Sequence, residues 1–244
     1  MAWFKSWFDS NYYPILYSKR NESEAQLFID NLLDKLSITN PIKVIDIGCG
    51  RGRHSVYLNS KGHIVTGIDV STESIEECRK LENPSLSFYV HDIRNLIRTN
   101  YFDLALSIFT SFGYFEKDSD NIKVLLNAKK SLKPGGIFVI DFINAVHTGK
   151  NLVQNEVKVI DGIQFNIARS LEKEVISKKI EIIDKENSFN FTEKIHAYTL
   201  DSFKTMIDKV QLELLGVFGS YHLDAYDPDN SARMILICRN PLID

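Results

Sequence analysis

The chain has 244 residues, of which 44% are hydrophobic and 25% are charged. This balance is typical of a globular protein and suggests neither a wholly disordered chain nor a membrane protein. The formal net charge is −3 at pH 7, and no run of lysine and arginine dominates a segment. The basic surface that duplex-binding proteins use is therefore missing, and nucleic acid is not an expected partner.

The cysteine and histidine content bears on compartment and metals. Cys49, Cys78 and Cys238 are odd in number and far apart, which fits neither a disulfide framework nor a paired-cysteine metal site. The six histidines form no cluster with metal-ligand spacing, so no metal is expected. No apolar run reaches the roughly 20 residues that span a bilayer, and the first residues hold no signal-peptide core. We expect a cytoplasmic protein.

The first 20 residues form a segment rich in aromatic side chains. Pro14 interrupts any long helix there. We interpret residues 1–20 as an aromatic flap that packs over another part of the protein. Its aromatic residues are Trp3, Phe4, Trp7, Phe8, Tyr12, Tyr13 and Tyr17.

Residues 21–152 alternate between helical and strand patterns and are predicted to form the core. Apolar residues recur at a helical period over residues 21–36, where Asn21 and Glu24 have the spacing of a capping box. Strands separated by helices indicate a parallel, doubly wound sheet covered on both faces. Strands are predicted over residues 42–47, 63–70, 86–90, 102–108 and 137–142, helices over residues 53–60, 74–80 and 120–131, and a turn over residues 133–136.

After residue 153 the pattern changes to the period of two that is typical of strands. Residues 153–198 predict an antiparallel lobe of three or four strands, and Asp161-Gly162 is a strong hairpin signal. We interpret this lobe as a lid. Residues 199–244 predict a closing helix followed by strands over residues 213–218 and 233–238, which complete the main sheet.

A glycine-rich loop joins the first predicted core strand to the next helix. It reads Asp46-Ile47-Gly48-Cys49-Gly50-Arg51-Gly52. The alternating glycines allow a sharp turn and the close approach of a ligand, and the following helix offers free N–H groups and a positive dipole end. Alone, the loop also fits a ligand-free turn or a nicotinamide or flavin nucleotide loop, although Arg53 occupies the place of the third glycine of the latter.

Two acidic residues stand at the ends of the next two strands, where ligands bind in open α/β sheets. Asp69 can accept hydrogen bonds from both hydroxyls of a ribose. Its alternative role is to cap the next helix, although Ser71 is nearer to that helix. Asp92 can accept the exocyclic amine of adenine while Ile93 packs on the ring. Together with Asp46, these residues describe a pocket for adenosine.

These motifs resemble the ordered motifs of class I methyltransferases that depend on S-adenosylmethionine (SAM). The resemblance rests on residues 44–52, Asp69, Asp92 and the run Leu132-Lys133-Pro134-Gly135-Gly136, and it covers roughly residues 21–142. It implies an α/β fold with a Rossmann-like, seven-stranded, doubly wound sheet whose last strand is antiparallel, here with an inserted antiparallel β lobe. It also implies SAM as cofactor and S-adenosylhomocysteine as product.

A narrower likeness concerns residues 102–115, which are similar to small-molecule N-methyltransferases such as glycine N-methyltransferases and amino-sugar dimethyltransferases. It implies that the Ile108 carbonyl receives the SAM ammonium group and that Arg20 pairs with the SAM carboxylate. Tyr17 would cover the methionine tail. The expected cofactor-binding residues are Tyr17, Arg20, Asp46, Gly48, Cys49, Gly50, Asp69, Val70, Asp92, Ile93 and Ile108.

The expected acceptor is a small molecule bound between core and lid, an amine in preference to a hydroxyl or carboxylate. Methyl transfer depends mainly on positioning, and no side chain is identified as a general base. The alternative function is a SAM-binding sensor or structural module without catalysis. We expect a monomer or homodimer. Candidate groups on the acceptor side are Tyr114, His196, Tyr198, Tyr221 and His222.

Overall fold

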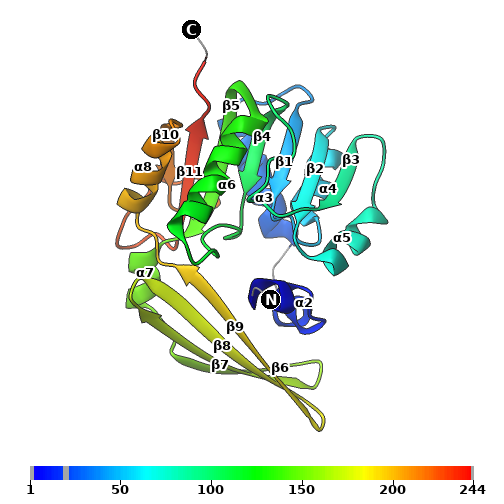
Figure 1. Cartoon of the computed structure of the whole chain (residues 1–244), viewed down its shortest axis with the longest axis vertical. Helices are drawn as coiled ribbons and strands as arrows, with labels where there is room; N and C mark the ends of the chain where they lie inside the picture. Colours follow the sequence, from blue (N-terminus) through cyan, green and yellow to red (C-terminus); the bar gives the residue numbers. More distant parts are fainter. Residues whose placement is uncertain (1–2, 19–21, 243–244) are drawn as a thin grey trace.

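The computed structural model describes residues 3–18 and 22–242. Its main body is a seven-stranded sheet with the order β10-β11-β5-β4-β1-β2-β3, covered by helices (Figure 1). A separate four-stranded sheet has the order β6-β7-β8-β9. The strands of the main sheet are β1 (Lys43–Ile47), β2 (Ile64–Asp69), β3 (Leu86–Val90), β4 (Phe102–Ser107), β5 (Leu132–Ile143), β10 (Glu213–Phe218) and β11 (Arg233–Arg239).

The order of the strands creates the crevice in which a ligand can bind. β1 pairs in parallel with both β2 and β4, so the chain runs outward through β2 and β3 before it returns to the other side of β1. At such a switch point the loops after neighbouring strands diverge and leave a crevice at the carboxyl edge. β11 is antiparallel to β5, which confirms the predicted seven-stranded sheet with an antiparallel strand.

Buried apolar side chains form two hydrophobic cores, one on each face of the sheet. One core joins the strands to α6 (Asp118–Ser131) and α8 (Leu200–Lys209). The other joins them to α3 (Glu22–Lys35), α4 (Arg53–Ser60) and α5 (Thr72–Arg79). Strands buried on both faces need the near-continuous apolar runs that the sequence shows.

The four-stranded sheet forms the predicted lobe. Its strands are consecutive and antiparallel, and the β6–β7 hairpin turns at Asp161 and Gly162, which both have positive φ, as the sequence predicted. The inner face of the lobe packs against the N-terminal helices α1 (Trp3–Phe8) and α2 (Tyr12–Leu16) (Figure 1). The lobe strands are β6 (Asn155–Ile160), β7 (Ile163–Glu172), β8 (Val175–Asp184) and β9 (Asn187–His196).

Pro14 lies in the first turn of the five-residue helix α2, where its missing N–H has no intrahelical partner, and the described residues around it form no long helix, as the sequence predicted. Two local features differ from the prediction. The predicted turn at residues 133–136 lies inside β5, which starts directly after α6 and carries an irregularity with φ +79° at Gly135. The helix α7 (Ala145–Lys150) was not predicted, and the Asn144 side chain caps it.

Candidate functional site

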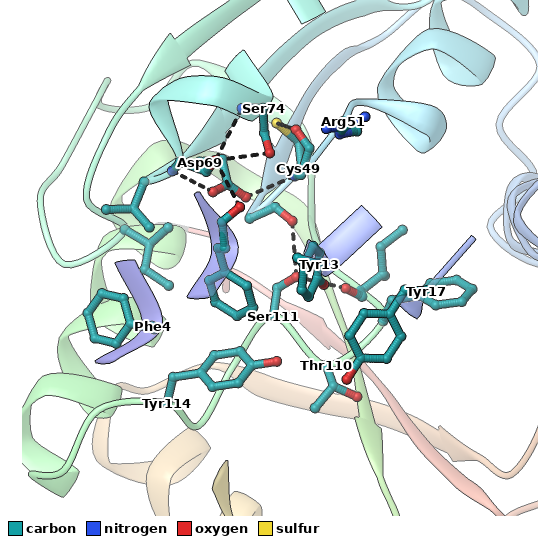
Figure 2. A pocket seen from close by; sticks show the side chains of 18 of the residues that line it. Phe4, Tyr13, Tyr17, Cys49, Arg51, Asp69, Ser74, Thr110, Ser111 and Tyr114 are labelled. Atoms are coloured by element: carbon teal, nitrogen blue, oxygen red, sulfur yellow. Dashed lines mark hydrogen bonds between the residues drawn. The ribbon is translucent and has the colours of Figure 1, made fainter. Parts of the chain in front are cut away.

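A cavity of about 280 Å³ lies at the carboxyl edge of β1, β2 and β4, under the N-terminal helices. Figure 2 shows Asp69 on one side of it and Tyr17 and Thr110 on the other. Most of the predicted cofactor residues are brought together here. Those that line the cavity are Tyr17, Gly48, Cys49, Gly50, Asp69, Val70, Asp92, Ile93 and Ile108.

The glycine loop is held against two neighbouring segments. The amides of Gly48 and Cys49 both donate to the Ile68 carbonyl, which fixes the loop on β2. Gly48 has φ +75°, and a Cβ there would lie 2.7 Å from the Ser111 Cβ. The Ser111 hydroxyl lies 3.0 Å from the Gly48 carbonyl and 2.9 Å from the Ile108 carbonyl. The loop after β1 and the loop after β4 therefore meet in a contact that only glycine permits.

The Asp69 carboxylate faces the glycine loop. One oxygen accepts from the Gly50 amide at 2.9 Å and the other from the Ser71 amide at 2.9 Å. Ser71 itself caps α5 through its side chain. Burial raises the pKa of Asp69. Because each carboxylate oxygen can accept more than one hydrogen bond, both retain acceptor capacity for a ribose in the cavity.

Asp92 also lines the cavity, next to Ile93. Its carboxylate accepts from Arg94 at 2.6 and 3.0 Å, and these hydrogen bonds lower the pKa of Asp92. The carboxylate is therefore ionised at neutral pH and suited to accept a hydrogen bond from an amine such as the exocyclic amine of adenine.

Two of the predicted residues are not placed on the cavity wall. Asp46 is 1% exposed and accepts a hydrogen bond from the Ser55 hydroxyl at 2.7 Å. Burial raises its pKa to about 6. Asp46 thus supports the glycine loop from behind, since Ser55 belongs to the helix that follows the loop. Arg20 lies outside the described residues.

The loop after β4 holds two strained residues. Phe109 and Thr110 have φ values of +55° and +66°, a conformation that costs on the order of 1–3 kcal/mol for a non-glycine residue. The fully buried Asp141 carboxylate accepts from the Phe109 amide at 2.7 Å, and its backbone carbonyl accepts from the Thr110 amide. Arg233 donates to Asp141 at 2.7 Å and to the Thr110 hydroxyl at 2.9 Å.

Asp141 and Arg233 were not predicted from the sequence. One signal was available: Asp141 is an acidic residue inside an otherwise apolar run of residues 137–142. A charge in a buried strand needs a partner, so its position indicates a functional or structural pair.

The N-terminal helices are fastened to the lobe by a polar cluster. The Glu193 carboxylate on β9 accepts from the Trp7 indole at 2.5 Å and from the Tyr17 hydroxyl at 2.6 Å. Lys178 on β8 lies 3.5 Å from Glu193 and donates to the Tyr17 hydroxyl. Lys178 and Glu193 are cross-strand partners on the face that buries Trp7. This cluster was also not predicted, because it joins segments far apart in the sequence.

A second cavity of about 720 Å³ adjoins the first and extends between the core and the lobe. Charged side chains on its wall include Glu24, Arg169 and Arg233. The acceptor-side candidates Tyr114, Tyr221 and His222 also line it. The residues that line both cavities are Phe8, Tyr13, Tyr17, Phe109, Thr110 and Tyr114.

The other two acceptor-side candidates have structural surroundings. The Tyr198 hydroxyl donates to Asp118 and contacts Asn121 within the core. The His196 ring stacks on Tyr198 at 5.0 Å and bonds to the Phe115 carbonyl. Neither residue lines the described cavities.

Residues 3–18 and 22–242 hold no group of three or more metal-ligating side chains. Within the same ranges, no helix is long and apolar enough to cross a membrane.

Residues 44–136 match the family model described as a methyltransferase domain. A Haemophilus influenzae protein named 'Probable S-adenosyl-L-methionine-dependent methyltransferase TehB' is 33% identical over 114 residues, which are 45% of this chain and 39% of TehB. The chain spans about two fifths of the length of the first curated relatives it matches. Over this region the chain is similar to methyltransferases, which agrees with the predicted family.

Solved structures share the fold over nearly the whole chain. A SAM-dependent methyltransferase from Clostridium acetobutylicum has a TM-score of 0.81 and 19% identity, and the match covers 94% of this chain and 96% of that one. SAM-bound CalS10, an amino pentose methyltransferase from Micromonospora echinaspora, has a TM-score of 0.70 and 16% identity, with coverage of 95% and 97%. These likenesses confirm the predicted Rossmann-like fold with its additional antiparallel sheet.

Proposed function

We propose that this chain, whose residues 44–136 match a methyltransferase domain, transfers a methyl group from SAM to a small-molecule acceptor. The observation that carries the proposal is the pair of adjoining cavities, one beside the glycine loop and one beneath the lobe, which share a wall of six residues. A donor and an acceptor held on the two sides of this wall would meet where the cavities join.

The cofactor would lie along the carboxyl edge of the sheet, in the order of the strands. Asp92 and Ile93 after β3 would hold the adenine, and Asp69, the last residue of β2, would hold the ribose hydroxyls. The Ile108 carbonyl after β4 would accept from the ammonium group of the methionine moiety. The glycine loop after β1 supports this placement, because its backbone can approach a ligand without a side chain in the way.

We place the acceptor in the second cavity, with an amine preferred to a hydroxyl or carboxylate. The volume of about 720 Å³ suits a small molecule. Charged side chains of both signs line the cavity, with the Glu24 carboxylate available to accept a hydrogen bond from an acceptor amine. CalS10 and KedS8, which share the fold, are described as an amino pentose methyltransferase and a sugar N-methyltransferase. Their names fit an amine acceptor.

The protein's contribution to catalysis would be alignment and exclusion of water. When bound, SAM supplies an electrophilic methyl group on a sulfonium. Tyr114, Phe109 and Thr110 would fix the donor–acceptor approach, since all three line both cavities. The aromatic side chains of Phe8 and Tyr13 would keep bulk water from the junction.

The remaining parts of the proposal concern partners and location. A small molecule is the proposed partner, nucleic acid is not expected, and the protein is proposed to act as a monomer or homodimer in the cytoplasm. The buried, unbridged Cys49, Cys78 and Cys238 fit a reducing compartment.

Two measurements test the function. Calorimetry should give saturable binding of SAM and S-adenosylhomocysteine and none of NAD; the reverse result would contradict the proposal. Transfer of labelled methyl from SAM should then be screened against paired amines and hydroxy compounds of similar size. We expect label on amines. Tight SAM binding with no transfer to any compound of the screen would favour the non-catalytic module.

A further inference from the structure

β6 is an edge strand of the lobe, and its outer edge has no strand partner among residues 3–18 and 22–242. It pairs with β7 in a regular register (Figure 1). The Gln154 carbonyl accepts from the Arg169 amide on β7. Because the backbone groups of successive residues point to alternate edges, Asn155, Val157 and Val159 direct their N–H and C=O groups away from β7. A regular edge of this kind is a template for another strand.

The side chains of β6 divide into an apolar and a charged set. Lys158 lies opposite the buried Phe165, so Lys158 and Glu156 belong to the inner face of the lobe. Val157 and Val159 alternate with them on the outer face and are 64% and 68% exposed. Exposed β-branched residues on an edge favour another strand, and β6 carries one charge of each sign. Whether these charges attract or repel that strand depends on what they face.

The charges of β6 are complementary to those of a second copy in one antiparallel register. A two-fold axis through Val157 places each Glu156 opposite Lys158 of the second copy and places Val157 opposite its own counterpart. Moving the axis by one residue places Glu156 opposite Glu156, or Lys158 opposite Lys158. Opposite charges on facing residues stabilise a strand pair, whereas like charges destabilise it. The pattern therefore favours a second copy of this chain in the register centred on Val157.

We propose that two copies of this chain associate through β6, antiparallel about a two-fold axis at Val157, and join their lobes into one continuous sheet. Such an interface is self-complementary, as a two-fold axis requires. α7 leads from the main body to the start of β6, so antiparallel pairing places the two main bodies at opposite ends of the joined strands (Figure 1). The inference is independent of the proposed function, because no residue of β6 lines either cavity.

The first test replaces the valine that the axis places opposite its counterpart. In Val157→Cys the two new thiols would face each other across a hydrogen-bonded pair, whose Cα atoms lie about 5.5 Å apart, within the range for a disulfide. The native cysteines are buried and do not compete. With oxidised glutathione, we expect most of this variant to run at twice the mass of the chain on a non-reducing gel and to return to the single-chain mass on reduction.

Val159→Cys is the matched control, because Val159 lies on the same strand and face and is similarly exposed. In the proposed register its two thiols would lie about 13 Å apart along the strands, too far for a disulfide. This variant should stay a single chain. Equal cross-linking of the two variants, cross-linking of Val159→Cys alone, or no cross-linking of Val157→Cys overturns the proposal.

The second test changes the charges and measures the mass by sedimentation velocity. The native chain should give a dimer, with twice the 28.0 kDa of one chain. Lys158→Glu and, separately, Glu156→Lys place like charges opposite each other and should give single chains. An equimolar mixture of the two variants has opposite charges in every facing pair of a mixed dimer, so the dimer should return. A role of either charge within its own chain does not predict this rescue.

A native chain that stays single at the highest concentration measured overturns the proposal, as does a mixture of the two charge variants that stays single although both are folded. Circular dichroism checks the fold of each variant, since Glu156 also pairs with Arg169 at 2.6 Å within its own chain. If Glu156→Lys does not fold, the comparison of Val157→Cys with Val159→Cys decides the outcome. A native dimer in which Val157→Cys does not cross-link places the contact elsewhere and also overturns the proposal.

Discussion

Gly48 stands where two loops of the site touch. An alanine there would need φ +75° and would place its Cβ 2.7 Å from the Ser111 Cβ. Gly62 has φ +93°, but a Cβ at that position would meet no atom within 4 Å. An alanine at Gly62 therefore has the backbone strain without the steric clash and serves as the control. We expect Gly48→Ala to lower the free energy of unfolding by clearly more than the roughly 1 kcal/mol expected of Gly62→Ala. Urea denaturation of both variants measures the difference, and equal losses would contradict the close contact.

Asp69 is the residue on which the ribose assignment depends. Asp69→Ala removes an acceptor for two ribose hydroxyls, and we expect SAM to bind about 1.5–3 kcal/mol more weakly. Calorimetry on the folded variant measures the loss. Because Asp69 also accepts from the Gly50 and Ser71 amides, circular dichroism should show first that the fold is retained. Unchanged affinity in a folded variant would place the ribose elsewhere.

Asp46 should give the stability of the protein a distinctive pH dependence. Its pKa is raised to about 6 from 3.8 by burial, so between pH 4 and pH 6 the folded chain binds more protons at this site than the unfolded chain. Stability from this group therefore falls as pH rises through that window. Relative to Asp46→Asn, the native chain should lose stability from pH 4 to pH 6 and then level off. Urea midpoints of both proteins at pH 4, 5, 6 and 7 without cofactor test the sign.

At the scale of elements, β11 carries two arginines in contrasting surroundings. Arg233 pairs with the fully buried Asp141, whereas Arg239 pairs with Glu213 and both partners are more than 40% exposed. Removing one partner of a buried pair leaves an uncompensated charge, so we expect Asp141→Ala to cost about 3–5 kcal/mol of unfolding free energy. Glu213→Ala should cost under about 1 kcal/mol. Thermal and urea unfolding measure both. Similar losses of unfolding free energy in the two variants would contradict the prediction that the buried Asp141–Arg233 pair matters more for stability.

The elements that follow from local pattern were predicted well. The core strands and the hairpin at Asp161 and Gly162 follow from apolar periodicity and turn chemistry, both of which are local properties. The start of β5 was placed too late because its glycines suggested a turn. In the structure Leu132 already pairs with Phe102, and the register then skips residues 133–136, where Gly135 and Gly136 exchange backbone hydrogen bonds with Asn240. α7 was missed because a helix of six residues is too short to show a clear helical period, although Asn144 is a suitable capping residue.

The same distinction applies to the site. Asp69 and Asp92 could be found because a strand end is visible in the sequence. The Asp141–Arg233 pair and the Glu193 cluster could not be derived in full, because they join residues that only the tertiary fold brings together. Asp46 has the right spacing for a ligand residue, but its side chain points to Ser55.

On the scale of the whole molecule, the N-terminal helices depend on the lobe for their position. Glu193 accepts from both Trp7 and Tyr17 and lines only the second cavity. We expect Glu193→Ala to weaken SAM several-fold, because the segment that covers the first cavity loses its polar attachment. Lys194→Ala, on the same strand but exposed, is the control. Calorimetry with both variants tests the dependence, and equal SAM affinity in the two variants would contradict it.

The six side chains common to both cavities have a consequence for how the two ligands influence each other. A shared wall cannot adjust to one ligand without changing the surface offered to the other, so the two binding events should have a coupling free energy. Thermodynamic reciprocity then fixes its form: the factor by which an acceptor changes the affinity for SAM equals the factor by which SAM changes the affinity for that acceptor. A true acceptor can therefore be recognised by its effect on cofactor affinity, even before any product is detected.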